Sequence, residues 1–186
     1  MRKWVALFLA EELTTTKQLE DDFFKMKKLL LIFVMLFSLL NYGQEIKGKI
    51  VKVKDGDTVV LLDSLNTMHT IRLGGIDCPE KNQDFGSSAK KFTSDAIYGK
   101  VVKFVRINTD QWGRKIGWVY YGDDFSLNLS EELLKNGLAW HYKKYDKNKK
   151  LDGLEQEARS QKIGIWSKEN PIFPEEFRKT KKSTKR

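Results

Sequence analysis

Hydrophobic and polar residues alternate in several short stretches between residues 45 and 121, which is typical of strands with one buried face. The alternation predicts strands at 45–53, 58–62, 68–73, 101–107 and 116–121. Within the first strand the apolar phase slips by one residue at Ile50 and Val51, which predicts a β-bulge. Asp55-Gly56 at the first hairpin favours a turn with positive φ. The first three strands are therefore expected to form a meander.

Apolar residues recur three and four positions apart in three later stretches, which predicts helices. The first is expected to be capped by Ser87 or Ser88 and to end near residue 97. The others are expected at 126–135 and 151–162, each with a glycine just past its end. A short extended piece is predicted at 139–142. Five strands and three helices in this order predict a mainly β fold with α: an OB-type, five-stranded Greek-key barrel packed with three helices.

The N-terminal part has the pattern of an export signal. Residues 29–40 form an apolar run interrupted only by Ser38, directly after Lys27 and Lys28. A membrane-spanning helix needs about 20 apolar residues, so this run is too short for a comfortable span. Residues 26–44 are therefore predicted to be a signal peptide of a secreted or periplasmic protein, and a retained membrane anchor is the alternative. Residues 1–25 contain five acidic residues and do not fit such a signal, so we interpret them as an upstream segment before a true start at Met26.

The folded domain is predicted to span residues 45–168, followed by a C-terminal extension at 169–186. Residues 170–177 contain two prolines and two phenylalanines and are expected to pack on the surface. Residues 178–186 contain six basic residues in nine, which predicts a mobile, solvated tail.

Charge and composition narrow the possible functions. The formal net charge is +9, which favours a polyanionic partner. Cys78 is the only cysteine, so no internal disulfide can form. Carboxylates beside this thiol would raise its pKa and no histidine lies nearby in sequence, which argues against a cysteine nucleophile. His69 and His141 lack metal-ligand spacing, so both are interpreted as structural or surface residues.

Three separated motifs carry clusters of charged residues. They read Asp-Gly-Asp-Thr at 55–58, Arg-Leu-Gly-Gly-Ile-Asp-Cys-Pro-Glu at 72–80 and Asp-Gln-Trp-Gly-Arg at 110–114. One such cluster alone could be a surface ion pair. In order, spacing and residue type, the three together resemble the thermonuclease (staphylococcal nuclease-like) family, from about Ile46 to Trp166. That resemblance implies a five-stranded OB-type barrel that hydrolyses DNA and RNA with calcium.

A phosphodiester is an anion, and a hard divalent cation held by oxygen ligands can act as its Lewis acid. Asp57 and Asp77 are the candidate ligands, because pairing of the strands that carry them would bring them together. The resemblance adds the backbone carbonyl of Cys78, at a position where the family usually has threonine. Asp55 either stiffens the site through water or shapes the turn.

The resemblance also assigns roles in catalysis and substrate binding. It implies that Glu80 is the general base and that Arg72 and Arg114 bind the phosphate. Trp112 stands in place of a family tyrosine and Tyr145 matches another, so both are expected to contact the nucleotide. The alternative for Trp112 is a loop aromatic that covers the core.

The sequence therefore predicts an exported, calcium-dependent nuclease for DNA and RNA that prefers single strands and leaves 3′-phosphorylated products. It is expected to act as a monomer without an obligate protein partner. Two alternatives remain at this stage: a noncatalytic OB-type module that binds nucleic acid, and a membrane-anchored surface protein.

Overall fold

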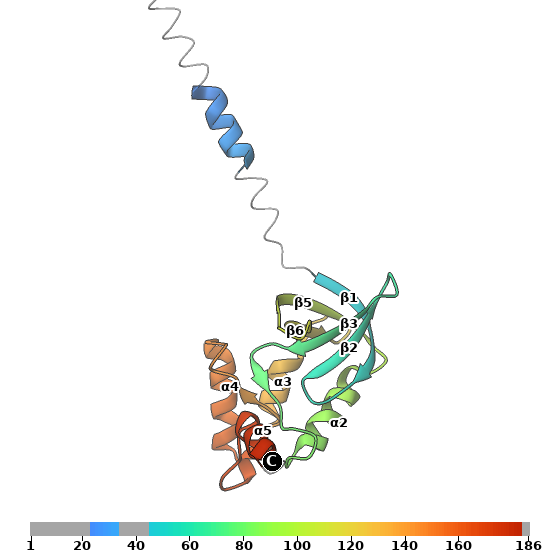
Figure 1. Cartoon of the computed structure of the whole chain (residues 1–186), viewed down its shortest axis with the longest axis vertical. Helices are drawn as coiled ribbons and strands as arrows, with labels where there is room; N and C mark the ends of the chain where they lie inside the picture. Colours follow the sequence, from blue (N-terminus) through green and yellow to red (C-terminus); the bar gives the residue numbers. More distant parts are fainter. Residues whose placement is uncertain (1–22, 34–44, 184–186) are drawn as a thin grey trace, which may run out of the picture. The chain divides into compact units, whose positions relative to one another are not determined.

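The computed structural model describes residues 23–33 and 45–183 (Figure 1). The chain divides into two compact units, 1–42 and 43–186, and each is described by itself. In the first unit, residues 23–33 form a helix in which Lys27 lies 4.3 Å from the ring centroid of Phe23. No helix among the described residues is long and apolar enough to span a membrane. The predicted upstream segment and signal peptide lie largely outside the described residues.

The second unit is built on a closed barrel of five strands. These are β1 (Glu45–Val53), β2 (Thr58–Asp63), β3 (Met68–Leu73), β5 (Val101–Thr109) and β6 (Lys115–Tyr121). Neighbouring strands run antiparallel in the order β3-β2-β1-β5-β6, and a parallel pairing of β3 with β6 closes the ring. The five predicted strands and the OB-type barrel are thus confirmed. The predicted bulge in β1 is also present, as a register shift between Ile50 and Lys52.

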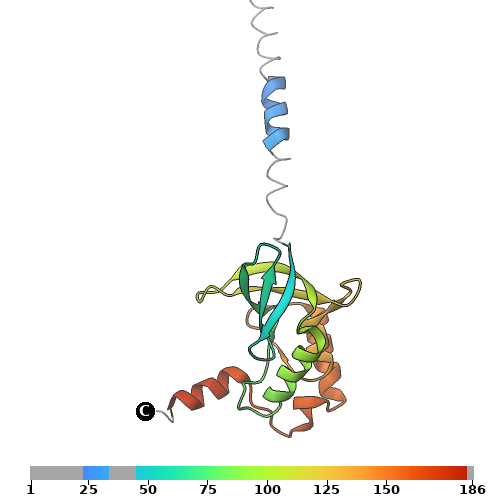
Figure 2. The ribbon, with the colours of Figure 1, turned by 90° about the vertical axis from the view of Figure 1, so that its right-hand side faces the viewer.

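The barrel encloses a core of aliphatic side chains around one phenylalanine. Alternate positions on each strand point inward and fill a barrel of this size completely. The largest side chains with almost no exposure in the barrel strands are Phe104, Ile50, Leu61, Ile71 and Leu73. Leu129, Leu133 and Leu134 extend this core toward the helices. Figure 2 shows α2 (Gly86–Ile97) and α4 (Lys149–Ser160) at the same end of the barrel.

The three predicted helices exist, but their first turns differ from the prediction. Helix α2 begins after Phe85, whose φ is 63°, and no side-chain hydrogen bond caps this described helix. The predicted serine cap is therefore wrong. A Cβ on Gly86 would lie against the carbonyl oxygen of Glu80, and only glycine permits this close return of the chain. The helix expected at 126–135 is α3 (Leu129–Lys135), which starts three residues later than predicted. Residues 127–128 instead form the short strand β7 and pair with β6, and the Asn128 side chain caps the helix.

The C-terminal extension differs most from the prediction. Residues 164–167 form the short 3-10 helix η1 (Gly164–Ser167), and α5 (Pro174–Ser183) follows it. The expected mobile tail from residue 178 is therefore wrong for the described residues up to 183. Two further short strands, β4 (Ile76–Asp77) and β8 (Trp140–His141), pair antiparallel outside the barrel. The predicted extended piece at 139–142 corresponds to β8.

Candidate active site

Two buried carboxylates meet at one arginine where the barrel strands end. Asp57 directly precedes β2, and the first residue of β2, Thr58, pairs with Arg72 on β3. Arg72 Nη1 contacts Asp57 Oδ2, and its Nη2 lies 2.6 Å from Asp77 Oδ1 at the end of β4. Strand pairing therefore brings the two aspartates together at one planar cation.

Further hydrogen bonds fix the Asp57 carboxylate in place. Its Oδ2 accepts the backbone N–H of Cys78 at 2.7 Å, and its Oδ1 accepts the hydroxyl of Thr58 at 3.1 Å. Asp77 is only 1% exposed, and Asp57 is also buried. Buried carboxylates persist only when they are paired with a cation or with hydrogen-bond donors. The turn that carries Asp57 is thus hydrogen-bonded to the backbone directly after β4.

The donor set fits a hard divalent cation. Both carboxylates converge on a position that a cationic guanidinium contacts in the structure. Because Cys78 donates its N–H to Asp57, its backbone lies beside the same carboxylate. Among the described residues, no three side chains of His, Cys, Asp or Glu are grouped to hold a metal ion. An ion here would therefore use two carboxylates, a backbone carbonyl and several waters, a set that suits calcium or magnesium.

The Cys78 side chain belongs to the core rather than to the site. It is buried in the main hydrophobic cluster, and this burial raises the pKa of its thiol well above the usual value, against a smaller opposing effect of Arg72. A Cβ on Gly56 would lie 2.8 Å from the Cβ of Ala89 and 2.9 Å from that of Cys78. Gly56 thus serves close packing against α2, and it does not adopt the positive φ that the sequence predicted. A neutral, buried thiol is neither a nucleophile nor a calcium ligand.

Asp55 has the role of a turn residue. Its Oδ1 accepts the backbone N–H of Asp57 at 3.2 Å, which shapes the turn ahead of β2. The histidines are structural, as expected: His141 is buried with Nε2 3.0 Å from Asp146, and His69 Nε2 lies 2.6 Å from Asp63.

Glu80 pairs with Arg178, which the basic composition of residues 178–186 predicted to lie in a solvated tail. Arg178 Nη1 lies 2.7 Å from Glu80 Oε1, and its Nη2 lies 3.0 Å from Asp77 Oδ2. The Glu80 side chain is 39% exposed, so water can reach it. A helix start could have been recognised from Pro174 followed by Glu175 and Glu176, since proline and acidic residues favour the first turn. Nothing local in the sequence shows that this helix reaches Glu80.

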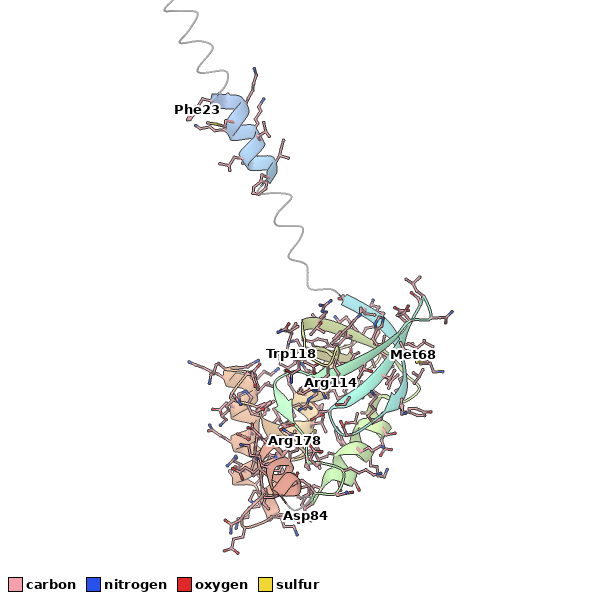
Figure 3. The ribbon with its side chains drawn as sticks, viewed as in Figure 1. Phe23, Met68, Asp84, Arg114, Trp118 and Arg178 are labelled. Atoms are coloured by element: carbon pink, nitrogen blue, oxygen red, sulfur yellow. The ribbon has the colours of Figure 1, made fainter. Side chains whose placement is uncertain are left out.

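Arg114 lies on the loop between β5 and β6 and has its own acidic partner. Its Nε is 2.6 Å from Asp110 Oδ2, and among the described residues its ion pair is with Asp110 rather than with Glu80. Burial acts to raise the pKa of Asp110, but the bonds from Arg114 and the backbone lower it overall. The Arg114 guanidinium lies 5.2 Å from the ring centroid of Trp112, which is 71% exposed and so does not cover the core. Figure 3 labels Arg114 on the barrel and Arg178 on α5.

Tyr145 presents a second exposed aromatic ring. It is 74% exposed and meets the ring of Tyr142 edge-on, with 4.9 Å between centroids. The Tyr142 hydroxyl donates to Glu175 Oε2 at 3.1 Å, and burial followed by this bond raises the pKa of Tyr142 to about 12. The Tyr145 side chain therefore lies next to the segment that anchors α5.

Comparisons with known proteins show which family the chain resembles. Residues 70–168 match the family described as Staphylococcal nuclease homologue. The chain is 35% identical to an "Uncharacterized endonuclease" of Haemophilus influenzae over 158 residues, 84% of this chain and 87% of the relative. It is 36% identical to an "Uncharacterized endonuclease" of Escherichia coli O157:H7, covering 80% and 95% of the two chains. It is 32% identical to a "Micrococcal nuclease" of Shigella flexneri, covering 81% and 90%.

Proposed function

Because this chain belongs to the family of staphylococcal nuclease homologues, we propose that it is a calcium-dependent nuclease that hydrolyses phosphodiester bonds of DNA and RNA. The observation that carries the proposal is the convergence of Asp57 and Asp77 on Arg72, with the accessible carboxylate of Glu80 beside them. A solvated surface ion pair would not need two buried acids.

Each residue of the site has a separate role in phosphodiester hydrolysis. Asp57, Asp77 and the Cys78 carbonyl would hold the calcium ion, which supplies Lewis-acid polarisation of a phosphoryl oxygen when bound. Glu80 takes a proton from the attacking water as the new oxygen–phosphorus bond forms. Arg72 and Arg114 donate to phosphoryl oxygens and stabilise the charge that develops there. The bond to the 5′ oxygen breaks and that oxygen takes up a proton, which leaves a 3′-phosphate on the other product.

The exposed aromatic residues suit a substrate with unpaired bases. The side chains of Trp112 and Tyr145 are largely exposed, and stacking on such rings is worth roughly 1–3 kcal/mol per base with little dependence on base identity. The net charge of +9 attracts polyanions. We therefore propose that single strands of DNA and RNA are preferred over duplexes. We also propose that residues 26–44 direct export and that the protein acts as a monomer outside the cytoplasm.

Digestion of denatured DNA by the purified protein tests the function. We expect cleavage with calcium, loss of cleavage in EGTA, and products that carry a 3′-phosphate. A duplex of the same sequence serves as the control and should be cut more slowly. Binding without cleavage would favour a noncatalytic module, and undiminished cleavage in EGTA would refute the metal assignment.

A further inference from the structure

The C-terminal helix is attached to the candidate site by several contacts besides the ion pairs of Arg178. Gln83 Nε2 donates to the carbonyl of Ile172, and the side chain of Gln83 also accepts the backbone N–H of Glu80 at 3.1 Å. Glu175, in the first turn of α5, accepts the hydroxyl of Tyr142. The start of α5 is thus connected both to the Glu80 loop and to the chain after β8.

The charges at the site are balanced by two guanidinium groups. Asp77 uses Oδ1 for Arg72 and Oδ2 for Arg178, while Glu80 uses Oε1 for Arg178. The side chain of Arg72 is 13% exposed and that of Arg178 is 41% exposed. Arg178 is therefore the more accessible of these two guanidinium groups to a large anion from solvent.

The geometry of this guanidinium leaves donors for another acceptor. An arginine has five N–H groups, and the contacts to Asp77 and Glu80 engage one nitrogen each, Nη2 and Nη1. The rigid, planar fork can therefore bind a phosphate oxygen while it still touches an acid of the site. Arg114 is held differently, because its Nε is bound to Asp110 and its guanidinium lies over Trp112.

We propose that Arg178 is a phosphate-binding residue of the active site, delivered by the C-terminal helix. In the free protein its guanidinium rests on Asp77 and Glu80, and it donates to a non-bridging oxygen of the scissile phosphodiester when a polynucleotide binds. The inference rests on the proposed nuclease function and adds a third arginine to it.

The test compares Arg178→Ala with Lys179→Ala. Lys179 is the next residue of α5, is exposed, and pairs only with Glu175 among the described residues, so its variant removes the same charge without touching the site. We expect Arg178→Ala to lower kcat on denatured DNA by about 10²–10³-fold, the usual loss for one transition-state donor. Lys179→Ala should stay within about twofold, as an exposed ion pair contributes little. Circular dichroism confirms that each variant is folded.

Two further measurements separate a chemical role from a structural one. Millimolar guanidinium chloride should restore part of the activity of Arg178→Ala, whereas sodium chloride at the same concentration should not. In EDTA, fluorescence anisotropy with a labelled single-stranded oligothymidylate should show weaker binding by Arg178→Ala, by roughly tenfold or more, the loss of one charge-assisted hydrogen bond. Lys179→Ala should show a much smaller loss.

Unchanged kcat and oligonucleotide affinity in Arg178→Ala would overturn the proposal. Increased activity would overturn it as well, and would show that α5 covers the site instead of serving it. If the wild-type protein proved inactive with calcium, the proposed nuclease function would fail, and the anisotropy comparison would still decide whether Arg178 binds phosphate.

Discussion

Replacing Glu80 by Gln is expected to lower kcat about 10²–10⁴-fold, the range typical of a lost general base. An amide has nearly the same shape as the carboxylate and can still accept the bond from Arg178, but it cannot take a proton from water. Because the backbone of Glu80 is held by Gln83, the loop should keep its conformation. Steady-state digestion of denatured DNA with calcium provides the measurement.

Asp84→Asn is a suitable control for this variant. Asp84 lies on the same loop, and its contact to Lys168 at 3.2 Å is on the surface, so removing its charge should leave kcat nearly unchanged. If the Gln variant at position 80 kept a rate within threefold of wild type, Glu80 would not be the base. Equal losses in both variants would indicate a general effect of loop charge.

Arg72→Gln is expected to affect both stability and catalysis. Without the guanidinium, Asp57 and Asp77 become two adjacent buried carboxylates without their shared cation, and breaking a buried pair costs about 3–5 kcal/mol. Without calcium, the melting temperature should fall by roughly 10 °C, given about 2–4 °C per kcal/mol for domains of about 150 residues. Activity should also fall about 10²–10³-fold from the loss of one phosphate donor.

Calcium should stabilise the Arg72→Gln variant more than the wild-type protein, because the freed carboxylates would bind the ion without displacing an arginine. Melting curves in EGTA and in calcium measure this difference. Arg114→Gln offers the comparison, since Asp110 keeps its hydrogen bonds from the backbone N–H groups of Trp112 and Arg114, and the expected stability loss is smaller than for Arg72→Gln. A calcium effect that is equal in the two variants would contradict the assignment of the site.

The barrel could be predicted from the sequence because its signals are local. Alternation of apolar and polar residues identified each strand, and the phase slip at Ile50 identified the bulge. The convergence of Asp57 and Asp77 also followed from local information, because Asp57 directly precedes β2, which pairs with the Arg72 strand, and Asp77 follows Arg72 by five residues. The spacing of apolar residues and the pairing of the strands thus account for the positions of Asp57, Arg72 and Asp77.

The contacts of Arg178 could not be predicted in the same way. The six basic residues at 178–186 are compatible with a solvated tail, and the helix start at Pro174 was the only opposing signal. The ion pair from Arg178 to Glu80 joins residues 98 positions apart and depends on where α5 packs. No local pattern encodes that placement.

Side-chain direction limited the prediction at two other places. The motif around Arg114 identifies the residue, but its ion pair with Asp110 depends on the side-chain rotamers within a short loop. Ser87 and Ser88 have the preferred chemistry of a helix cap, yet the return of the chain against Glu80 sets the start of α2. In both cases tertiary packing decides between local alternatives of similar energy.

The central claim is that Asp57 and Asp77 hold one divalent ion together with the backbone of Cys78. Calorimetric titration of the metal-free protein with calcium tests it most directly, with Asp77→Asn and Cys78→Thr titrated alongside. We expect one calcium per chain in the wild-type protein, nearly the same affinity in Cys78→Thr because only the carbonyl is used, and loss of binding in Asp77→Asn. No calcium binding by the wild-type protein, or unchanged binding by Asp77→Asn, would contradict the claim.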